Sequence, residues 1–247
     1  MSIWGKLIGG AAGFAIGGPI GLLIGVAAGH LADNVRTKKN SKCKLLSFDS
    51  NTLQKVFAVA LIALSAKMAK ADGKVTRDEV DAFKSVFRVS QKDMKAVGKI
   101  FNQARQDASD YRQYAEQVAK VFTSQPEVLE QFLGALIHIA MADGNIHPKE
   151  HLFLVDVAKI FGFSKEQFEK IGARHGLTNG EDPYEVLGIS PKSTNQEIKN
   201  TYRILVKENH PDQLIAKGVP KEVLDAANDK LARINDAYAK IEKQRDL

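Results

Sequence analysis

Residues 194–213 read TNQEIKNTYRILVKENHPDQ and decide how the C-terminal part of the chain folds. Thr194 and Glu197 have the spacing of a capping box, which marks the start of a helix. Apolar residues then recur at three- and four-residue steps, as they do on one face of a helix: Ile198, Tyr202 and Leu205. The stretch therefore predicts an amphipathic helix that ends at about Asn209 and is followed by a His-Pro-Asp turn.

Two further helices are expected on either side of this one. Asp182 as N-cap and Pro183 at the first helical position predict a short helix, which Leu187 and Gly188 close. Another helix is expected from about residue 221 to 243. Its apolar stripe consists of Ala227, Leu231, Ile234, Tyr238 and Ile241. The two longer helices are expected to pack as an antiparallel pair.

This C-terminal pattern resembles the J domain of DnaJ co-chaperones, and the resemblance covers residues 182 to about 243. The matching parts are D-x-Y-E-V-L-G, E-I-K-x-x-Y-R-x-L, H-P-D and I-N-x-A-Y, in that order. The resemblance implies a DnaK-type ATPase chaperone as the partner, whose ATP hydrolysis the domain stimulates. It assigns the contact to His210, Pro211 and Asp212, together with a basic face of the preceding helix. Gln213 stands where J domains commonly carry Lys, which leaves the strength of the contact open.

The basic face has its own pattern in the sequence. Its side chains are four residues apart and therefore share one side of a helix: Lys199, Arg203 and Lys207. Such charges steer the encounter with a partner of opposite charge. The alternative is a basic stripe that only faces water.

The middle of the chain repeats itself with an offset of 71 residues. The segment ADGKVT at 71–76 is followed by Glu79, and the segment ADGNIH at 142–147 is followed by Glu150. Each copy predicts a helix, an Asp-Gly turn and a second helix. Thr76 with Glu79 forms a capping box, and Pro148 occupies the first position of the matching helix. A later helix is expected to begin with the Ser164–Gln167 pair.

The repeated middle resembles the TerB (tellurite-resistance) domain, which implies an all-helical bundle over residues 51–171. Clustered acidic residues of this family are sometimes proposed to bind metal, and this role carries over to Asp72, Glu79, Asp143 and Glu150. Four carboxylates form a site for a hard cation only if the two turns converge. The alternative is that each Asp caps a turn and each Glu caps a helix.

Three histidines of the middle region are expected to be structural. His147 and His151 belong to the run HPKEH, which differs from the H-E-x-x-H motif of zinc proteases. Because Pro148 places His147 at or before a helix start, capping and surface roles are expected for the pair. His138 lies within an apolar helix pattern and is expected to be packed.

The N-terminal region is expected to cross a membrane. Residues 7–32, 26 in all, contain no Asp, Glu, Lys or Arg. A helix of this length spans about 39 Å, more than the bilayer core of about 30 Å. Residues 1–32 are therefore predicted to form one transmembrane segment. Basic residues follow it in the linker at 33–50, which by the positive-inside rule predicts a periplasmic N-terminus and cytoplasmic C-terminal domains at a bacterial inner membrane.

Glycine recurs at every fourth position of the transmembrane segment. Small residues at this spacing let two membrane helices approach closely. The spacing predicts a homodimer that pairs through Gly9, Gly13, Gly17, Gly21 and Gly25. The alternative is a glycine-rich anchor that does not self-associate. Cys43 in the following linker is either acylated or an unmodified surface thiol.

Composition and charge exclude several classes of protein. The chain has 247 residues, of which 44% are hydrophobic and 26% charged, as in a folded protein. Residues 1–50 hold six Lys and Arg against two Asp and Glu, whereas residues 182–247 hold 11 of each. This distribution fits a membrane-flanking segment and argues against a nucleic-acid partner. One cysteine excludes an internal disulfide and a four-thiolate zinc site.

The order of the parts predicts the function. A transmembrane segment, a TerB-like domain, a linker at 172–181 and a J domain at 182–247 are typical of membrane-anchored DnaJ-like co-chaperones. We therefore expect an all-α protein that activates a partner ATPase, contacts membrane lipid and is not itself an enzyme. No nucleotide motif is present, and no cofactor is expected. The alternative is a TerB-type metal- or membrane-linked sensor or binding protein with an accessory J domain.

Overall fold

The structure is a computed structural model, and the residues that it describes are 49–71, 83–84, 94–106, 111–142, 144, 146–177 and 182–246. Within these ranges the chain is helical and contains no β-strand. The predicted all-α fold is therefore confirmed for this part of the chain.

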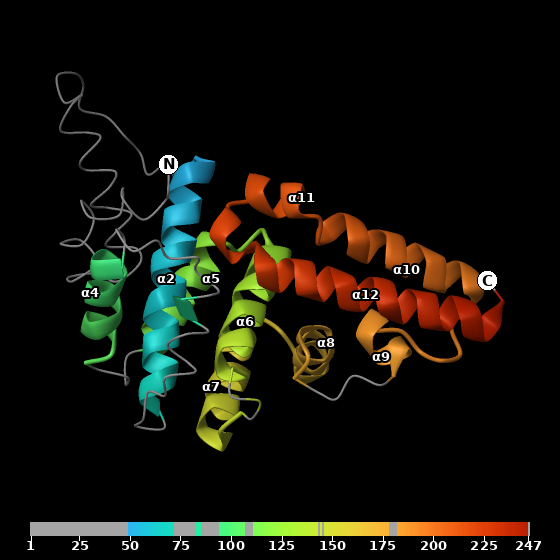
Figure 1. Ribbon diagram of the computed structural model, residues 1–247, viewed down its shortest axis with the longest axis horizontal. Helices are drawn as coiled ribbons and strands as arrows, with labels where there is room; N and C mark the ends of the chain where they lie inside the picture. Colours follow the sequence, from blue (N-terminus) through green and yellow to red (C-terminus); the bar gives the residue numbers. More distant parts are fainter. Residues whose placement is uncertain are drawn as a thin grey trace.

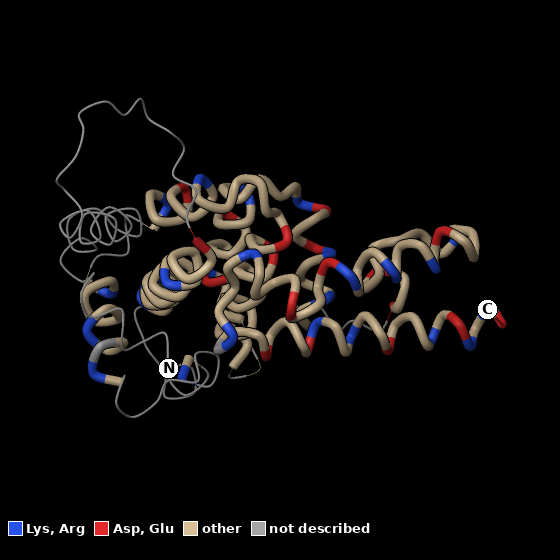
Figure 2. Tube along the Cα trace, turned by 90° about the horizontal axis from the view of Figure 1, so that it is seen from above, with Lys and Arg blue, Asp and Glu red and all other residues tan. Residues whose placement is uncertain are grey.

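The described helices form a bundle from which an arm projects (Figure 1). The bundle consists of α2 (Ser50–Ala71), α4 (Met94–Ala104), α5 (Tyr111–Val121), α6 (Pro126–Ala140), α7 (Pro148–Ile160) and α8 (Lys165–His175). The C-terminal part consists of α9 (Pro183–Leu187), α10 (Asn195–Glu208), α11 (Pro211–Ala216), the 3₁₀ turn η3 (Lys221–Val223) and α12 (Leu224–Arg245). Figures 1 and 2 both show α10 and α12 side by side, with the C-terminus at the tip of the arm.

Helix α2 is the centre of the bundle. Helices α4, α5, α6 and α7 pack against it, and every residue from Val56 to Leu64 is 0% exposed. A helix that is apolar on all sides belongs in a protein core or in a membrane. By length and composition α2 is the one described helix that could cross a membrane, but 78% of its apolar window is buried in the bundle. We therefore assign α2 to the core.

Aromatic rings fill the space between α2 and its neighbours. Phe57 of α2 lies edge-on to Phe132 of α6, with 4.9 Å between the ring centroids, and 6.1 Å from Phe122. Phe132 in turn lies 5.7 Å from Phe161 at the end of α7. Edge-to-face pairs of this kind add about 0.5–1.5 kcal/mol beyond the burial of their area. The rings thus tie α6 and α7 to the central helix.

The start of α7 follows the predicted cap. His147 Nδ1 accepts a hydrogen bond from the Lys149 backbone N–H at 3.3 Å, and Glu150 Oε2 accepts one from the His147 N–H at 3.1 Å. The helix begins at Pro148, as expected, so the capping role of His147 is confirmed. The expectation that His138 is packed is wrong, because its side chain is exposed on α6.

Of the two predicted copies of the repeated segment, the structure describes the turn and the following helix start only in the second. Gly144, the glycine of the expected Asp-Gly turn, has φ +84°, in the left-handed region that favours glycine. Helices α6 and α7 flank this turn, and Ser164 and Gln167 form the expected capping box of α8. Residues 72–80, which contain the first turn and its capping box, lie outside the described residues.

Helices α9, α10 and α12 form an arm with a small core of its own, and α10 packs along α12 as predicted. Its buried residues are Val186, Leu187, Ile198, Leu205, Ile234, Ala237 and Ile241. Tyr202 of α10 stacks on Tyr238 of α12 with 4.0 Å between the ring centroids. The Thr194–Glu197 capping box opens α10, and Asn209 is its C-cap.

The segment between α10 and α12 differs from the expectation. Pro211 opens a further helix, α11, and the helix expected from residue 221 begins as the 3₁₀ turn before α12 continues to Arg245. With six residues α11 is too short to show a periodic pattern in the sequence. Its start still has a local cause, since proline is favoured at the first position of a helix.

Replacing Phe132 by Ala should lower the free energy of unfolding by about 3–5 kcal/mol, because it leaves a cavity among the rings around α2. Urea denaturation of the full chain in detergent micelles, followed by circular dichroism, measures this change. Leu152 on α7 is 67% exposed, and Leu152→Ala should change the stability by less than about 0.5 kcal/mol. Equal, small effects of both changes would contradict the aromatic core.

Candidate functional site

The His-Pro-Asp sequence forms the junction between α10 and α11. Asn209 ends α10 and donates its backbone N–H to the carbonyl of Leu205 at 3.1 Å. His210 is the N-cap of α11, and its Nδ1 accepts a hydrogen bond from the Asp212 N–H at 3.3 Å. Pro211 occupies the first helical position, where an N–H would have no helical partner. The three residues therefore lead the chain directly from one helix into the next.

This junction presents its polar groups to solvent. The side chain of His210 is 52% exposed and that of Asp212 is 86% exposed, with 3.8 Å between the imidazole Nδ1 and a carboxylate oxygen. Pro211 between them is half-buried. An accessible carboxylate accepts strong, charge-assisted hydrogen bonds from a cationic partner. The geometry thus leaves both groups accessible for the contact that the resemblance to J domains implies for them.

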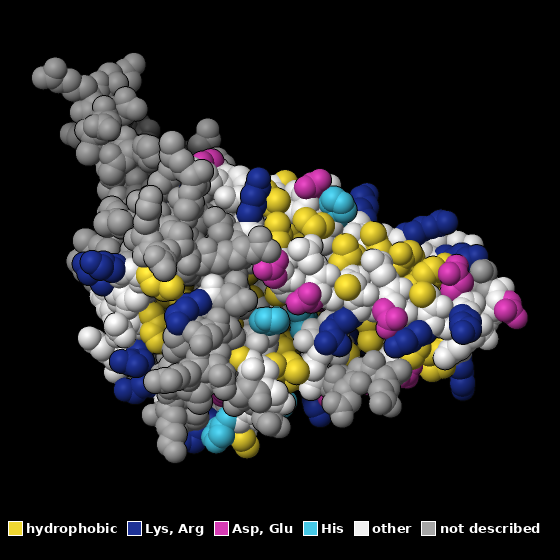
Figure 3. Space-filling view, in the orientation of Figure 1, with side chains coloured by type: hydrophobic (Ala, Val, Ile, Leu, Met, Phe, Trp, Pro, Cys, Tyr) yellow, Lys and Arg dark blue, Asp and Glu magenta, His cyan; other side chains and the backbone are white. Residues whose placement is uncertain are grey.

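The basic residues of α10 lie on the helix that leads to the junction. Arg203 and Lys207 are exposed, and Lys199 is half-buried. Ile204 beside them is 55% exposed. Figure 2 shows Lys and Arg mixed with Asp and Glu along α10 and α12, and the face seen in Figure 3 likewise mixes both signs. Lys199, Arg203 and Lys207 thus lie on an arm whose described residues carry charges of both signs.

Asn209, directly before His210, connects the arm to the bundle. It is 3% exposed. Its Oδ1 accepts hydrogen bonds from Gln131 Nε2 of α6 at 2.9 Å and from Lys230 Nζ of α12 at 2.5 Å. Its Nδ2 donates to the Leu205 carbonyl at 2.7 Å. One side chain thus joins three helices at the base of the His-Pro-Asp junction.

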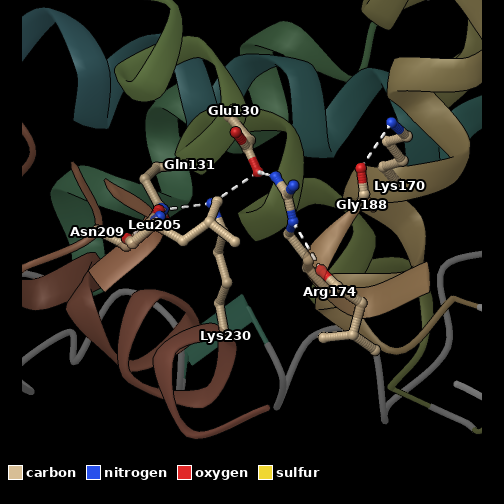
Figure 4. Close-up of polar contacts among 9 residues, drawn as sticks. Glu130, Gln131, Lys170, Arg174, Gly188, Leu205, Asn209 and Lys230 are labelled. Carbon is tan, nitrogen blue, oxygen red and sulfur yellow. Dashed lines mark hydrogen bonds and ion pairs between the residues drawn. The ribbon is translucent and has the colours of Figure 1, made fainter. Parts of the chain in front are cut away.

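Lys230 and Arg174 share one carboxylate, that of Glu130 (Figure 4). Lys230 is 1% exposed, and its Nζ lies 2.6 Å from Glu130 Oε1. The same oxygen lies 3.0 Å from an Arg174 guanidinium nitrogen, and Arg174 Nε donates to the Val186 carbonyl of α9 at 3.1 Å. Bundle and arm thus meet in an interdomain cluster, which consists of Glu130, Gln131, Arg174, Asn209 and Lys230.

The charges of this cluster depend on one another. Burial by itself would raise the pKa of Glu130, but the positive charges of Lys230 and Arg174 lower it to about 2. Burial lowers the pKa of Lys230, and the Glu130 carboxylate opposes this change. Removing one partner from a buried ion pair typically costs about 3–5 kcal/mol, because the other charge stays buried alone. The cluster therefore disfavours any arrangement in which arm and bundle separate.

His175, at the end of α8, lies beside the same charges. Its imidazole packs against Gly134 of α6, where a Cβ atom would lie 2.2 Å from the ring. Its Nε2 atom is buried without a hydrogen-bond partner. Burial, followed by the positive charge of Lys230, lowers the His175 pKa to about 3. The imidazole is therefore neutral at pH 7.

The interdomain cluster is not predicted by the sequence. One signal was present, because Lys230 lies three residues after Ala227 and four before Ile234, on the apolar stripe of α12. Glu130 and Gln131 gave no such signal, since polar residues are common on helix surfaces. Their role arises only when segments far apart in the sequence come together.

Of the four residues predicted to form a metal site, the structure describes only Glu150. The Glu150 carboxylate caps α7, as the alternative reading of the sequence proposed. Asp72, Glu79 and Asp143 lie outside the described residues. Among the residues that are described, no group of three or more His, Cys, Asp or Glu side chains could hold a metal ion. The predicted membrane-helix contacts also lie outside the described part: Gly9, Gly13, Gly17, Gly21 and Gly25.

Three family models match the chain in the predicted order. The co-chaperone DjlA transmembrane domain matches residues 1–42. The tellurite resistance protein TerB matches residues 58–173, and the DnaJ domain matches residues 182–246. The predicted succession of a transmembrane segment, a TerB-like domain and a J domain is therefore confirmed.

Relatives match over nearly their whole length. Co-chaperone protein DjlA of Photobacterium profundum is 32% identical over 274 residues, which cover 98% of this chain and 99% of that protein. The protein of the same name from Coxiella burnetii is 32% identical over 270 residues and 100% of both chains. That of Escherichia coli (strain K12) is 28% identical over 272 residues and 99% of both chains. No solved structure matches.

Acidification should destabilise the folded chain. Between pH 6.5 and about 3, the unfolded chain binds a proton on His175 that the folded chain does not bind. Between pH 4.5 and about 2, the unfolded chain likewise binds a proton on Glu130 that the folded chain does not bind. Below pH 6.5 the free energy of unfolding should therefore fall by up to about 1.4 kcal/mol per pH unit for the His175 step.

Urea denaturation between pH 7 and pH 4.5 measures this step. The His175→Gln variant should lose most of the pH dependence in this range, because its side chain binds no proton. The same slope in the unchanged chain and in the His175→Gln variant would contradict a neutral His175 in the folded chain.

Proposed function

This chain belongs to the DjlA family of co-chaperones, and we propose on this premise that it stimulates the ATPase of a DnaK-type chaperone at the cytoplasmic face of a bacterial inner membrane. Its relatives are named co-chaperones, and its C-terminal domain matches the DnaJ domain. It is thus a regulator that acts on a partner. The proposed action is the activation of the partner's ATP hydrolysis.

The exposed His-Pro-Asp junction carries this proposal. It combines an accessible imidazole and an accessible carboxylate with a proline that restricts the backbone between them. Neither polar side chain is needed for the core of the arm, which consists of apolar residues of α9, α10 and α12. Groups that are held in place but not used for folding are available for a partner.

We propose a division of roles along α10. Arg203 and Lys207 face solvent, and their charges raise the rate of encounter with an acidic surface of the chaperone. Lys199, one helical turn before Arg203, completes the basic stripe. Asp212 then accepts hydrogen bonds from a cationic group of the partner, and these bonds hold the complex in its productive geometry.

The membrane location rests on the N-terminal part of the chain. Residues 1–42 match a transmembrane domain, so this is a membrane protein with one such domain. The basic residues after the uncharged run support a cytoplasmic location of the J domain. In that compartment it would meet ATP and an ATP-dependent chaperone.

Replacing Asp212 by Asn should nearly abolish stimulation of a DnaK-type ATPase in a single-turnover assay, because losing one member of a charged pair costs about 2–5 kcal/mol. The fold should persist, since this carboxylate is 86% exposed, and its interaction with the start of α11 is worth less than about 1 kcal/mol. Lys207→Ala should weaken stimulation less, and more visibly at low salt.

The matched control is Asp236→Asn, which removes an exposed carboxylate of α12 that pairs with Lys240. This variant should stimulate like the unchanged chain. If Asp212→Asn kept full stimulation, the assignment of function to the His-Pro-Asp junction would be wrong. If the variant unfolded, Asp212 would have a structural role.

The proposed topology can be tested with membrane vesicles. A protease added outside should digest the J domain in inverted vesicles and spare it in sealed right-side-out vesicles, because the domain would face the cytoplasm. Disruption of the right-side-out vesicles with detergent is the control for accessibility. Digestion of the J domain in the sealed right-side-out vesicles would contradict the topology, and release of the chain by alkaline carbonate would contradict an integral anchor.

A further inference from the structure

Helix α11, which begins at the His-Pro-Asp junction, is packed into the core of the bundle. Leu214 and Val219 are 0% and 1% exposed and belong to the same apolar cluster as the residues of α2. Val223 and Ala227, from η3 and the start of α12, belong to it as well. The core of the arm contains none of these four residues. The bundle thus holds the segment that follows the junction.

The first turns of α2 also contact the backbone of this segment. Ser50 Oγ donates a hydrogen bond to the Ile215 carbonyl at 3.2 Å, and Gln54 Nε2 lies 3.5 Å from the same oxygen. Gly218 has φ +102°, and a Cβ atom there would lie 2.6 Å from the Cβ of Leu53. Both the conformation and the close approach require glycine. This fit indicates a specific contact.

On the other side of the junction, the interdomain cluster holds Asn209. Its amide receives hydrogen bonds from Gln131 and Lys230, and Glu130 fixes Lys230 in turn. His210, Pro211 and Asp212 therefore lie between two anchors, Asn209 before them and the α11 contacts after them. Both anchors depend on bundle residues.

The docked arm leaves the partner-facing groups accessible. His210 and Asp212 are 52% and 86% exposed, and Arg203 and Lys207 are exposed as well. A contact that blocked the junction would bury these side chains. Among the described residues, docking therefore supports the junction without covering it.

We propose that the bundle is a rigid mount for the His-Pro-Asp junction, and that Glu130 and Gln131 of α6 are positioning residues for the stimulation of the partner ATPase. The activity part rests on the function proposed above, whereas the docking of the arm does not. The role of the TerB-like domain in this proposal is mechanical. It holds a short segment of the J domain in the geometry that the partner needs.

The first readout is hydrogen exchange of the full chain in detergent micelles, which needs no partner. Amides of residues 213–219 should be protected in the unchanged chain. Glu130→Gln should raise their exchange rate at least about tenfold, because Lys230 loses its counter-ion and the Asn209 anchor weakens. Amides of α12 beyond Ile234, which packs in the core of the arm, should keep their protection.

The second readout is the stimulated ATPase of a DnaK-type chaperone, measured against the concentration of this chain. Glu130→Gln should lower the maximal rate about tenfold and change the half-saturating concentration by less than about twofold, because Arg203 and Lys207 still steer the encounter. Gln131→Leu leaves every charge in place and should show the same pattern more weakly. It keeps the test valid if Glu130→Gln fails to fold.

The matched control is Asp156→Asn within the bundle. The Asp156 carboxylate of α7 accepts a hydrogen bond from the Tyr111 hydroxyl and pairs with Arg112, each at 2.8 Å. This change also removes an ion-paired carboxylate, but one that contacts residues of α5 and not of the arm. Both readouts should stay at the values of the unchanged chain.

Unchanged hydrogen-exchange rates of residues 213–219 in both α6 variants would contradict the proposal that the bundle rigidly supports the His-Pro-Asp junction. Faster exchange with equal or greater stimulation would overturn the positioning role, since docking would then be dispensable or inhibitory. If the unchanged chain stimulates no DnaK-type ATPase, the proposed function and the positioning role that rests on it both fail, while the exchange rates still decide whether the bundle holds the junction.

Discussion

The Glu130 carboxylate compensates two cations, Lys230 and Arg174, at the boundary between bundle and arm. A buried ion pair of this kind adds little stability compared with apolar residues of the same size, but it strongly penalises arrangements in which one partner is missing. Its main effect is therefore to select one orientation of the two domains. The free energy of docking comes from apolar burial around Leu214 and Val219.

The boundary between the TerB-like domain and the J domain lies at a different place in the sequence than in the packing of the apolar cores. The family models divide the chain between residues 173 and 182. The apolar core does not follow this division, because the start of α12 and the buried face of α11 contribute to the core of the bundle. Only the outer half of the arm has a core of its own. The J domain thus shares its inner end with the domain that precedes it.

Local signals in the sequence predicted the starts of four described helices, α7, α8, α9 and α10. The capping boxes at Thr194 and Ser164 and the prolines at the starts of α7 and α9 act over four residues, so a single sequence reveals them. Helix α11 was missed because one and a half turns show no periodicity. The interdomain cluster was missed for another reason, since Glu130 and Lys230 meet only in the folded chain. Composition by itself does not separate a core helix such as α2 from a membrane helix, because both are apolar on all sides. The resemblance of residues 51–171 to the TerB domain correctly placed α2 in the bundle.

The contact between α11 and the start of α2 also limits where the His-Pro-Asp junction can be. Ser50 and Gln54 contact α11, so the junction lies at the end of the bundle where α2 begins. The uncharged run ends at Ala32, and 17 residues separate it from Ser50. At no more than about 3.6 Å per residue, these 17 residues can span at most about 60 Å. In the proposed topology, the start of α2 and the junction beside it would stay within about this distance of the membrane surface, so that a chaperone would meet the junction only in a thin layer along the membrane.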